Sequence, residues 1–168
     1  MIIRMEKTDD HSTIREVNLK AFPSDVEATL VERIRNSMDV ISMVATVEDK
    51  VVGHILFSPL TIENDKESFP ALILAPIAVL PEYQNQGIGS KLVEKGIVEC
   101  RNQGHSIIIL VGHPEFYPRF GFKPAEQNGI QHPFEVPEDV FMVYELVTDA
   151  LCRVNGVLKY SMAFDDLL

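Results

Sequence analysis

Apolar and polar positions alternate in the first residues of the chain and then change to a helical spacing. The alternation from Ile2 to Glu6 predicts a first strand. Apolar residues then recur every three or four positions up to about Phe22, where Pro23-Ser24-Asp25 interrupts them. The spacing resumes from about Val26 to Ser37, so two consecutive helices are expected after the first strand.

The next part of the pattern predicts strands. The segments 41–48 and 51–62 have the composition of a hairpin that turns at Asp49-Lys50. Within its second strand, Gly53 suits a bulge or a close approach of another element. The run from Leu72 to Val79 is apolar at nearly every position, which is typical of a central strand covered on both faces.

A glycine-led helix is expected to follow, ending near Asn102 with Gly104 in a left-handed conformation. Ser106 to Val111 is a further buried strand, and a strand, a helix and a strand joined in this way form a right-handed parallel crossover. Beyond a short segment around 116–122 and a loop from Ala125 to Asp139, two more strands are expected near 141–147 and 157–163.

The resulting order is β-α-α-β-β-β-α-β-α-β-β. The expected fold class is therefore mixed α/β, with a central mixed sheet of about seven strands flanked by about four helices. A chain of 168 residues with 46% hydrophobic residues suits a single domain over residues 1–168, and no internal shift in composition marks a linker.

Composition and charge limit the binding partners and the cellular compartment that can be expected for the protein. The net charge of −10 argues against nucleic acid as a partner and is compatible with the attraction of cationic amines. No signal peptide and no apolar run of transmembrane length is present, so no membrane partner is expected. Cys100 and Cys152 form no disulfide framework, which favours a reduced, cytoplasmic setting. Both a monomer and a homodimer remain open.

The segment from Tyr83 to Leu92 holds the clearest chemical signal, because it joins the apolar strand to the following helix through Gln84-Asn85-Gln86-Gly87-Ile88-Gly89. A glycine turn at a helix start gathers backbone N–H groups and the positive end of the helix dipole, which together bind anions. A Walker loop is excluded because Ser90 precedes Lys91. A dinucleotide fingerprint would need a third glycine where Leu92 stands.

The order Gln-x-x-Gly-x-Gly after an apolar strand resembles the acyl-CoA loop of the GNAT acetyltransferase superfamily. About thirty residues downstream, Glu115-Phe116-Tyr117-Pro118-Arg119-Phe120-Gly121-Phe122 matches the second CoA motif of that family. The C-terminal segment, with Tyr160 and Phe164-Asp165, is similar to a bacterial subgroup of predicted N-acetyltransferases. The likeness is best from about Leu72 to Pro124.

This resemblance implies transfer of an acetyl group from acetyl-CoA, as cosubstrate, to a primary amine of a small molecule or peptide, by direct attack in a ternary complex. Tyr117 matches the family's proton donor to the leaving thiolate, and a phenol is protonated at neutral pH. The positions that match the family's cofactor-binding residues are Ile77, Ala78 and Val79 on the strand, and Gln84, Asn85, Gln86, Gly87, Ile88, Gly89 and Ser90 in the loop.

The general base has no clear candidate. Many members of the family carry a glutamate on the strand before the loop, but no acidic residue stands between Ala71 and Leu80. The remaining candidates are Asp25, Glu27, His54 and His113, each of which also has a structural explanation. The scattered histidines predict no metal site. The alternatives are a protein of the same fold that binds acyl-CoA without transfer, and transfer of a longer acyl group.

Overall fold

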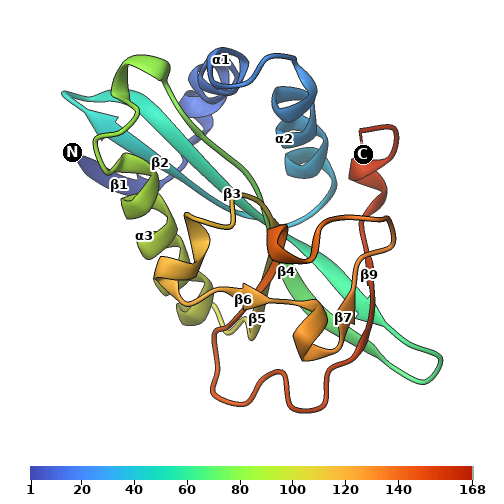
Figure 1. Cartoon of the computed structure of the whole chain (residues 1–168). Helices are drawn as coiled ribbons and strands as arrows, with labels where there is room; N and C mark the ends of the chain where they lie inside the picture. Colours follow the sequence, from blue (N-terminus) through green and yellow to red (C-terminus); the bar gives the residue numbers. More distant parts are fainter. Residues whose placement is uncertain (168) are drawn as a thin grey trace. The chain divides into compact units, whose positions relative to one another are not determined.

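Residues 1–167 are described by a computed structural model of the chain, which contains three α-helices and nine strands. The helices are α1 (His11–Ala21), α2 (Val26–Ser37) and α3 (Ile88–Asn102). The strands are β1 (Ile2–Met5), β2 (Ile41–Val47), β3 (Lys50–Glu63), β4 (Ser68–Val79), β5 (Ile107–Val111), β6 (Lys123–Pro124), β7 (Ile130–Gln131), β8 (Phe141–Glu145) and β9 (Gly156–Lys159). Parallel and antiparallel pairs both occur, so this is a mixed α/β fold with a mixed sheet (Figure 1).

Contacts between residues group the chain into two compact units. Unit 1 comprises residues 1–58, 75–99 and 163–167, and unit 2 comprises residues 59–74 and 100–162. The expected organisation as a single domain stays a prediction. No helix within residues 1–167 combines the length and the apolar character that crossing a membrane requires.

In unit 1, β1, β2 and the first part of β3 pair side by side in antiparallel fashion. The register shifts beside Gly53: Ala45 lies opposite Gly53, but Thr46 lies opposite Val51. The shift is the bulge expected at this glycine. An added Cβ at Gly53 would lie 3.1 Å from Leu92 Cδ1, so the strand also approaches α3 closely there.

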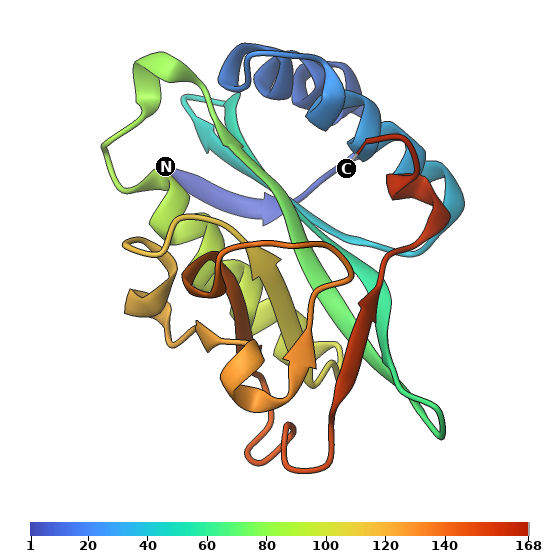
Figure 2. The same ribbon diagram turned by 45° about the vertical axis from the view of Figure 1, so that its right-hand side comes forward.

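Successive residues of β3 point to opposite faces, and each face of unit 1 receives different helices. Gly53 and Phe57 face α3, and Phe57 packs so tightly on Gly96 that a Cβ there would lie 2.5 Å from Phe57 Cε2. His54 points the other way, where the side-chain amide of Asn18 from α1 contacts its ring. Helices α1 and α2 therefore lie on one face of these strands and α3 on the other (Figure 2).

In unit 2, β4 pairs in parallel with β5, joining Leu72 to Ile108 and Ile73 to Ile109. This confirms the parallel pair expected from the two apolar runs, and the ladder ends before Pro76. Strand β8 pairs antiparallel with β5 and with β6, while β9 runs beside the end of β3 and beside β7 (Figure 1).

The end of α3 also follows the sequence. Gly104 has a φ of 88° and donates its N–H to Arg101 O at 3.0 Å. His105 N–H reaches back to Cys100 O at 3.1 Å. This pair of bonds is the Schellman arrangement, in which a left-handed residue closes the helix.

Several boundaries differ from those expected. The segment around 116–122, counted as a fourth helix, is only a 3-10 turn at Tyr117–Phe120, because Pro118 and Gly121 leave no room for a longer helix. Strand β4 begins at Ser68 rather than near Leu72, since pairing within the β3–β4 hairpin holds its polar start as well. The last strand stops at Lys159, and two-residue strands β6 and β7 raise the count to nine.

Candidate functional site

The start of α3 presents free backbone donors. The first turn of the helix is closed by Lys91 N–H, which donates to Gly87 O at 3.1 Å. The N–H groups of Ile88, Gly89 and Ser90 precede that bond and have no acceptor inside the helix. With the positive end of the helix dipole, they form a place for an anion such as a diphosphate.

Two left-handed residues shape the loop before the helix. Asn85 has a φ of 61° and Gly87 a φ of 86°. A Cβ added at Gly87 would meet no atom within 4 Å, so the glycine is needed for its backbone conformation and for open access to the neighbouring N–H groups. Both residues lie in the segment whose pattern predicted an anion-binding loop.

Side-chain amides fix this loop. Gln84 Nε2 donates to Val79 O at 2.9 Å, and Gln86 Nε2 donates to Glu82 O at 3.2 Å. The first bond ties the loop to the end of β4, the strand that carries the other predicted cofactor-binding positions. Among these, Ala78 is buried, whereas Ile77 and Val79 are partly exposed, so their side chains alternate between the two faces.

Tyr117 belongs to unit 2 and is 6% exposed. Its ring meets Phe116 and Phe122 edge to face, with centroids 5.0 and 5.8 Å away. Gly112 passes close beside it, because a Cβ on Gly112 would lie 2.5 Å from Tyr117 Cε2. Burial raises the pKa of the phenol from 10.0 to about 12, so the hydroxyl keeps its proton at neutral pH.

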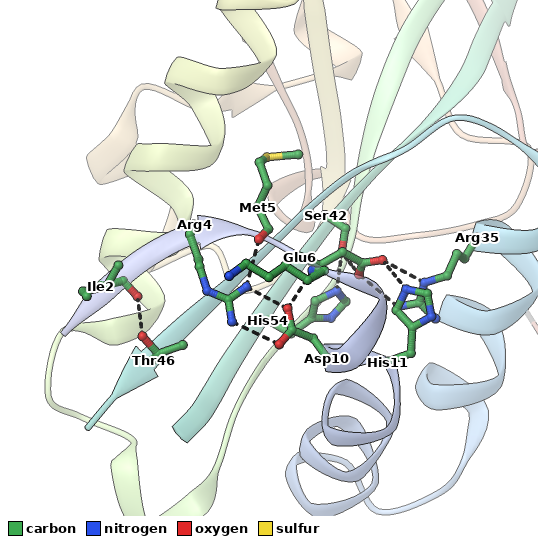
Figure 3. A network of polar contacts seen from close by, with 11 residues as sticks. Ile2, Arg4, Met5, Glu6, Asp10, His11, Arg35, Ser42, Thr46 and His54 are labelled. Carbon is green, nitrogen blue, oxygen red and sulfur yellow. Dashed lines mark hydrogen bonds and ion pairs between the residues drawn. The ribbon is translucent and has the colours of Figure 1, made fainter. Parts of the chain in front are cut away.

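His54, a candidate base, lies in a buried polar network of unit 1 and is 0% exposed (Figure 3). Asn18 Nδ2 donates to His54 Nδ1 at 3.3 Å, which places the imidazole proton on Nε2. Nε2–H then donates to Ser42 Oγ at 2.9 Å, and the Ser42 hydroxyl donates to Glu6. Burial lowers the pKa of His54 to about 4, so the ring is neutral.

Glu6 is the charged centre of the same network. Arg35 donates to both of its carboxylate oxygens at 2.9 Å, and His11 Nε2 lies 3.0 Å from Oε2. Burial would raise the pKa of Glu6, but the bonds from Arg35 and Ser42 outweigh burial and lower it. The network joins β1, β2, β3 and both helices of that face, and His54 is fully engaged in it. His54 is therefore structural rather than a base that meets an acceptor.

The other candidate bases differ in burial. Asp25 and His113 are exposed, and Asp25 stands just before α2, where its carbonyl accepts Thr29 N–H at 2.9 Å. Glu27 is half-buried, and its Oε1 is buried with no hydrogen-bond partner in the described part of the chain. Ser58, which sequence reasoning missed, is 0% exposed and its hydroxyl is also unpartnered there. The sequence signal for Ser58 would have been a polar residue on the same face of a mostly apolar strand as Leu56 and His54.

The loop from Ala125 to Asp139 contains a surface hollow of about 500 Å³. Glu126, Phe134, Glu135, Val136 and Pro137 line it. His132 anchors this segment, since its Nδ1 lies 3.1 Å from the Phe134 N–H and its Nε2 lies 2.8 Å from the Tyr160 hydroxyl. Within residues 1–167, no three or more histidine, cysteine or acidic side chains are grouped as metal ligands would be.

Comparisons with known proteins identify the family of the chain. A model of the acetyltransferase (GNAT) domain matches residues 2–125. The uncharacterized N-acetyltransferase YjhQ of Escherichia coli K12 is 40% identical over 134 residues, which cover 77% of this chain and 74% of the relative. YhbS, an uncharacterized N-acetyltransferase of the same organism, is 32% identical over 167 residues, covering 98% and 99%.

Two solved structures share the fold and hold the cosubstrate or its product. Escherichia coli YhbS in complex with CoA has a TM-score of 0.91 at 31% identity, over 98% of this chain and 91% of that chain. A GNAT acetyltransferase from Brucella melitensis in complex with acetyl-CoA has a TM-score of 0.78 at 30% identity, over 98% and 97%. The chain therefore belongs to the GNAT family of N-acetyltransferases and is an acetyl-CoA-dependent acyltransferase.

Proposed function

We propose that this protein transfers the acetyl group of acetyl-CoA to a primary amine by direct attack in a ternary complex. The observation that carries the proposal is the loop before α3, where left-handed Asn85 and Gly87 leave the N–H groups of Ile88, Gly89 and Ser90 free. These groups would bind the CoA diphosphate. The backbone of Ile77, Ala78 and Val79 would hold the pantetheine arm as an added strand.

Tyr117 would donate the proton that the leaving thiolate needs. Its support is the match of its position to the family motif and a buried phenol that stays protonated at neutral pH. Direct transfer is favoured because Cys100 is buried and the exposed Cys152 lies in a turn rather than in a strand-to-helix nucleophile elbow. The acceptor would be a small-molecule or peptide amine, and a net charge of −10 favours a cationic one.

The test is acetyl-CoA-dependent thiol release over a broad panel of amines, with the product mass measured for each amine that responds. Transfer is expected for at least one class of primary amine, with an acetylated product and no acetylated protein intermediate. Tight CoA binding without thiol release against the whole panel would instead support a non-catalytic acyl-CoA binder. A panel of acyl-CoA chain lengths, run with the best amine, separates acetyl from longer acyl transfer.

A further inference from the structure

Most of the buried oxygen atoms without a partner belong to residues of unit 1. Within residues 1–167, four buried side-chain polar atoms have no hydrogen-bond partner in the protein, and all four are oxygens. Three of them belong to unit 1: Asn18 Oδ1, Glu27 Oε1 and Ser58 Oγ. An unsatisfied buried acceptor costs about 1–3 kcal/mol, so such groups are normally met by a donor from water or from a ligand.

Glu27 is placed where an apolar residue would be expected. It lies three, four and seven positions before Leu30, Val31 and Ile34, so it shares their face of α2. Those three side chains are 7%, 2% and 0% exposed. Glu32 on the same helix has the arrangement usual for a surface glutamate, since its half-exposed carboxylate forms an ion pair with Arg15 at 3.0 Å. Helix α2 thus carries one half-buried carboxylate, that of Glu27, for which residues 1–167 provide no ion pair.

Ser58 lies on the face of β3 that helices α1 and α2 cover. It lies on the face of β3 that also carries His54 and Leu56, and α1 covers this face through Asn18. Figure 2 shows α2 beside α1 on that side of the strands. Asn18 is already committed through its amide nitrogen to Ile14 O and to His54. Asn18 therefore belongs to the polar network although its Oδ1 is unpartnered, whereas Glu27 and Ser58 contribute unpartnered oxygens from outside that network.

These atoms suit a protonated amine. An ammonium group carries three N–H donors and a positive charge, and it is matched by a carboxylate and a hydroxyl oxygen with free lone pairs. We propose that Glu27 binds the ammonium of the acceptor and takes a proton from it, with Ser58 Oγ as a second acceptor. This inference rests on the proposed function and assigns the general base that the sequence left open.

The proposed acetyl transfer begins with removal of a proton from the bound amine. Glu27 takes one proton from the bound ammonium and later releases it to solvent. The lone pair of the neutral amine forms a C–N bond with the thioester carbonyl carbon, the C–S bond breaks, and its electron pair leaves on sulfur. The sulfur takes a proton from Tyr117, and the second proton lost by the nitrogen restores the phenol. The products are the N-acetyl amine, CoA thiol and one proton.

The experiment compares Glu27→Gln, Glu27→Asp and Ser58→Ala with wild type, and uses Glu32→Gln as a matched control from the same helix. The amine that responds best in the thiol-release panel is the acceptor. Steady-state kinetics give separate constants for acetyl-CoA and amine. Calorimetry with CoA present measures binding of the same amine without turnover, and urea denaturation checks the fold of each variant.

Glu27→Gln is expected to lower kcat/KM for the amine by roughly 100-fold, the ordinary contribution of a general base, with KM for acetyl-CoA unchanged. Glu27→Asp should recover part of the loss. Ser58→Ala is expected to raise the amine KM roughly fivefold, the value of one hydrogen bond, without lowering stability, because it removes an unpartnered hydroxyl. Calorimetry should show weaker amine binding in both variants, and Glu32→Gln should match wild type.

Two results would overturn the assignment. Wild-type kinetics for the amine in Glu27→Gln would show that the carboxylate neither binds nor deprotonates the acceptor. Equal losses for amine and acetyl-CoA, together with a lower urea midpoint, would show that Glu27 is structural. A wild-type protein that acetylates no amine would instead refute the proposed function itself, so the two failures are distinguishable.

Discussion

Lowering the pH should destabilise this protein chiefly through the fully buried imidazole of His54, with a smaller contribution in the same direction from half-buried His132, whose pKa burial also lowers. His54 is neutral in the folded state because burial lowers its pKa from 6.5 to about 4. In the unfolded chain the ring would take up a proton near pH 6.5. Between these two values the unfolded state binds more protons than the folded state, so stability is fully present above about pH 6.5 and is lost as the pH falls toward 4.

The size of the loss in stability follows from the difference between the folded and unfolded pKa values of His54. Each unit of pKa difference corresponds to about 1.4 kcal/mol. At pH 5 the unfolded ring is almost fully protonated and the folded ring is almost fully neutral, which gives a loss of about 2 kcal/mol relative to pH 7.5. The loss approaches about 3 kcal/mol near pH 4. The pKa of Glu6 is lowered below its usual 4.5, so Glu6 contributes in the same direction but mainly below pH 5.

The assay is urea denaturation of wild type and His54→Gln at several pH values from 7.5 to 5, in one buffer of constant ionic strength. The wild type should lose about 2 kcal/mol over this range, whereas the variant, although less stable at pH 7.5, should lose much less. His105→Gln, a change at a partly exposed histidine of unit 2, controls for the removal of an ordinary imidazole. Parallel pH slopes in wild type and His54→Gln would refute the reasoning.

Three further outcomes are expected. Tyr117→Phe should lower kcat at least 100-fold while the Kd for CoA, measured by calorimetry, stays unchanged; equal turnover would remove the phenol from the mechanism. Gly87→Ala should cost about 1 kcal/mol of stability and weaken CoA binding severalfold, whereas Gly104→Ala, with a similar φ of 88° at the other end of α3, should cost as much stability without affecting CoA. Gly112→Ala should lower kcat more than it changes KM, because the new Cβ would lie 2.5 Å from Tyr117 Cε2; unchanged kcat would show that the ring moves freely.

The sequence by itself predicted most of the helices and strands and the glycine loop before α3. The spacing of hydrophobic residues distinguishes helices from strands. The conformation of the loop before α3 depends on Gly87 and Asn85, which adopt left-handed conformations that few other residues tolerate. The same local logic located the bulge at Gly53 and the helix end at Gly104. Each of these features depends on residues that are close in the chain, so the pattern alone could predict it.

Only the tertiary structure decided which polar side chains already have hydrogen-bond partners. His54 and Glu27 looked alike as candidate bases, but His54 is held by Ser42 and Asn18, residues 12 and 36 positions away. Glu27 Oε1, in contrast, has no partner among residues 1–167. Burial and pairing arise from segments distant in sequence, which no local pattern records. For the same reason the sequence did not single out Ser58, because its complete burial is decided by the packing of distant segments around β3.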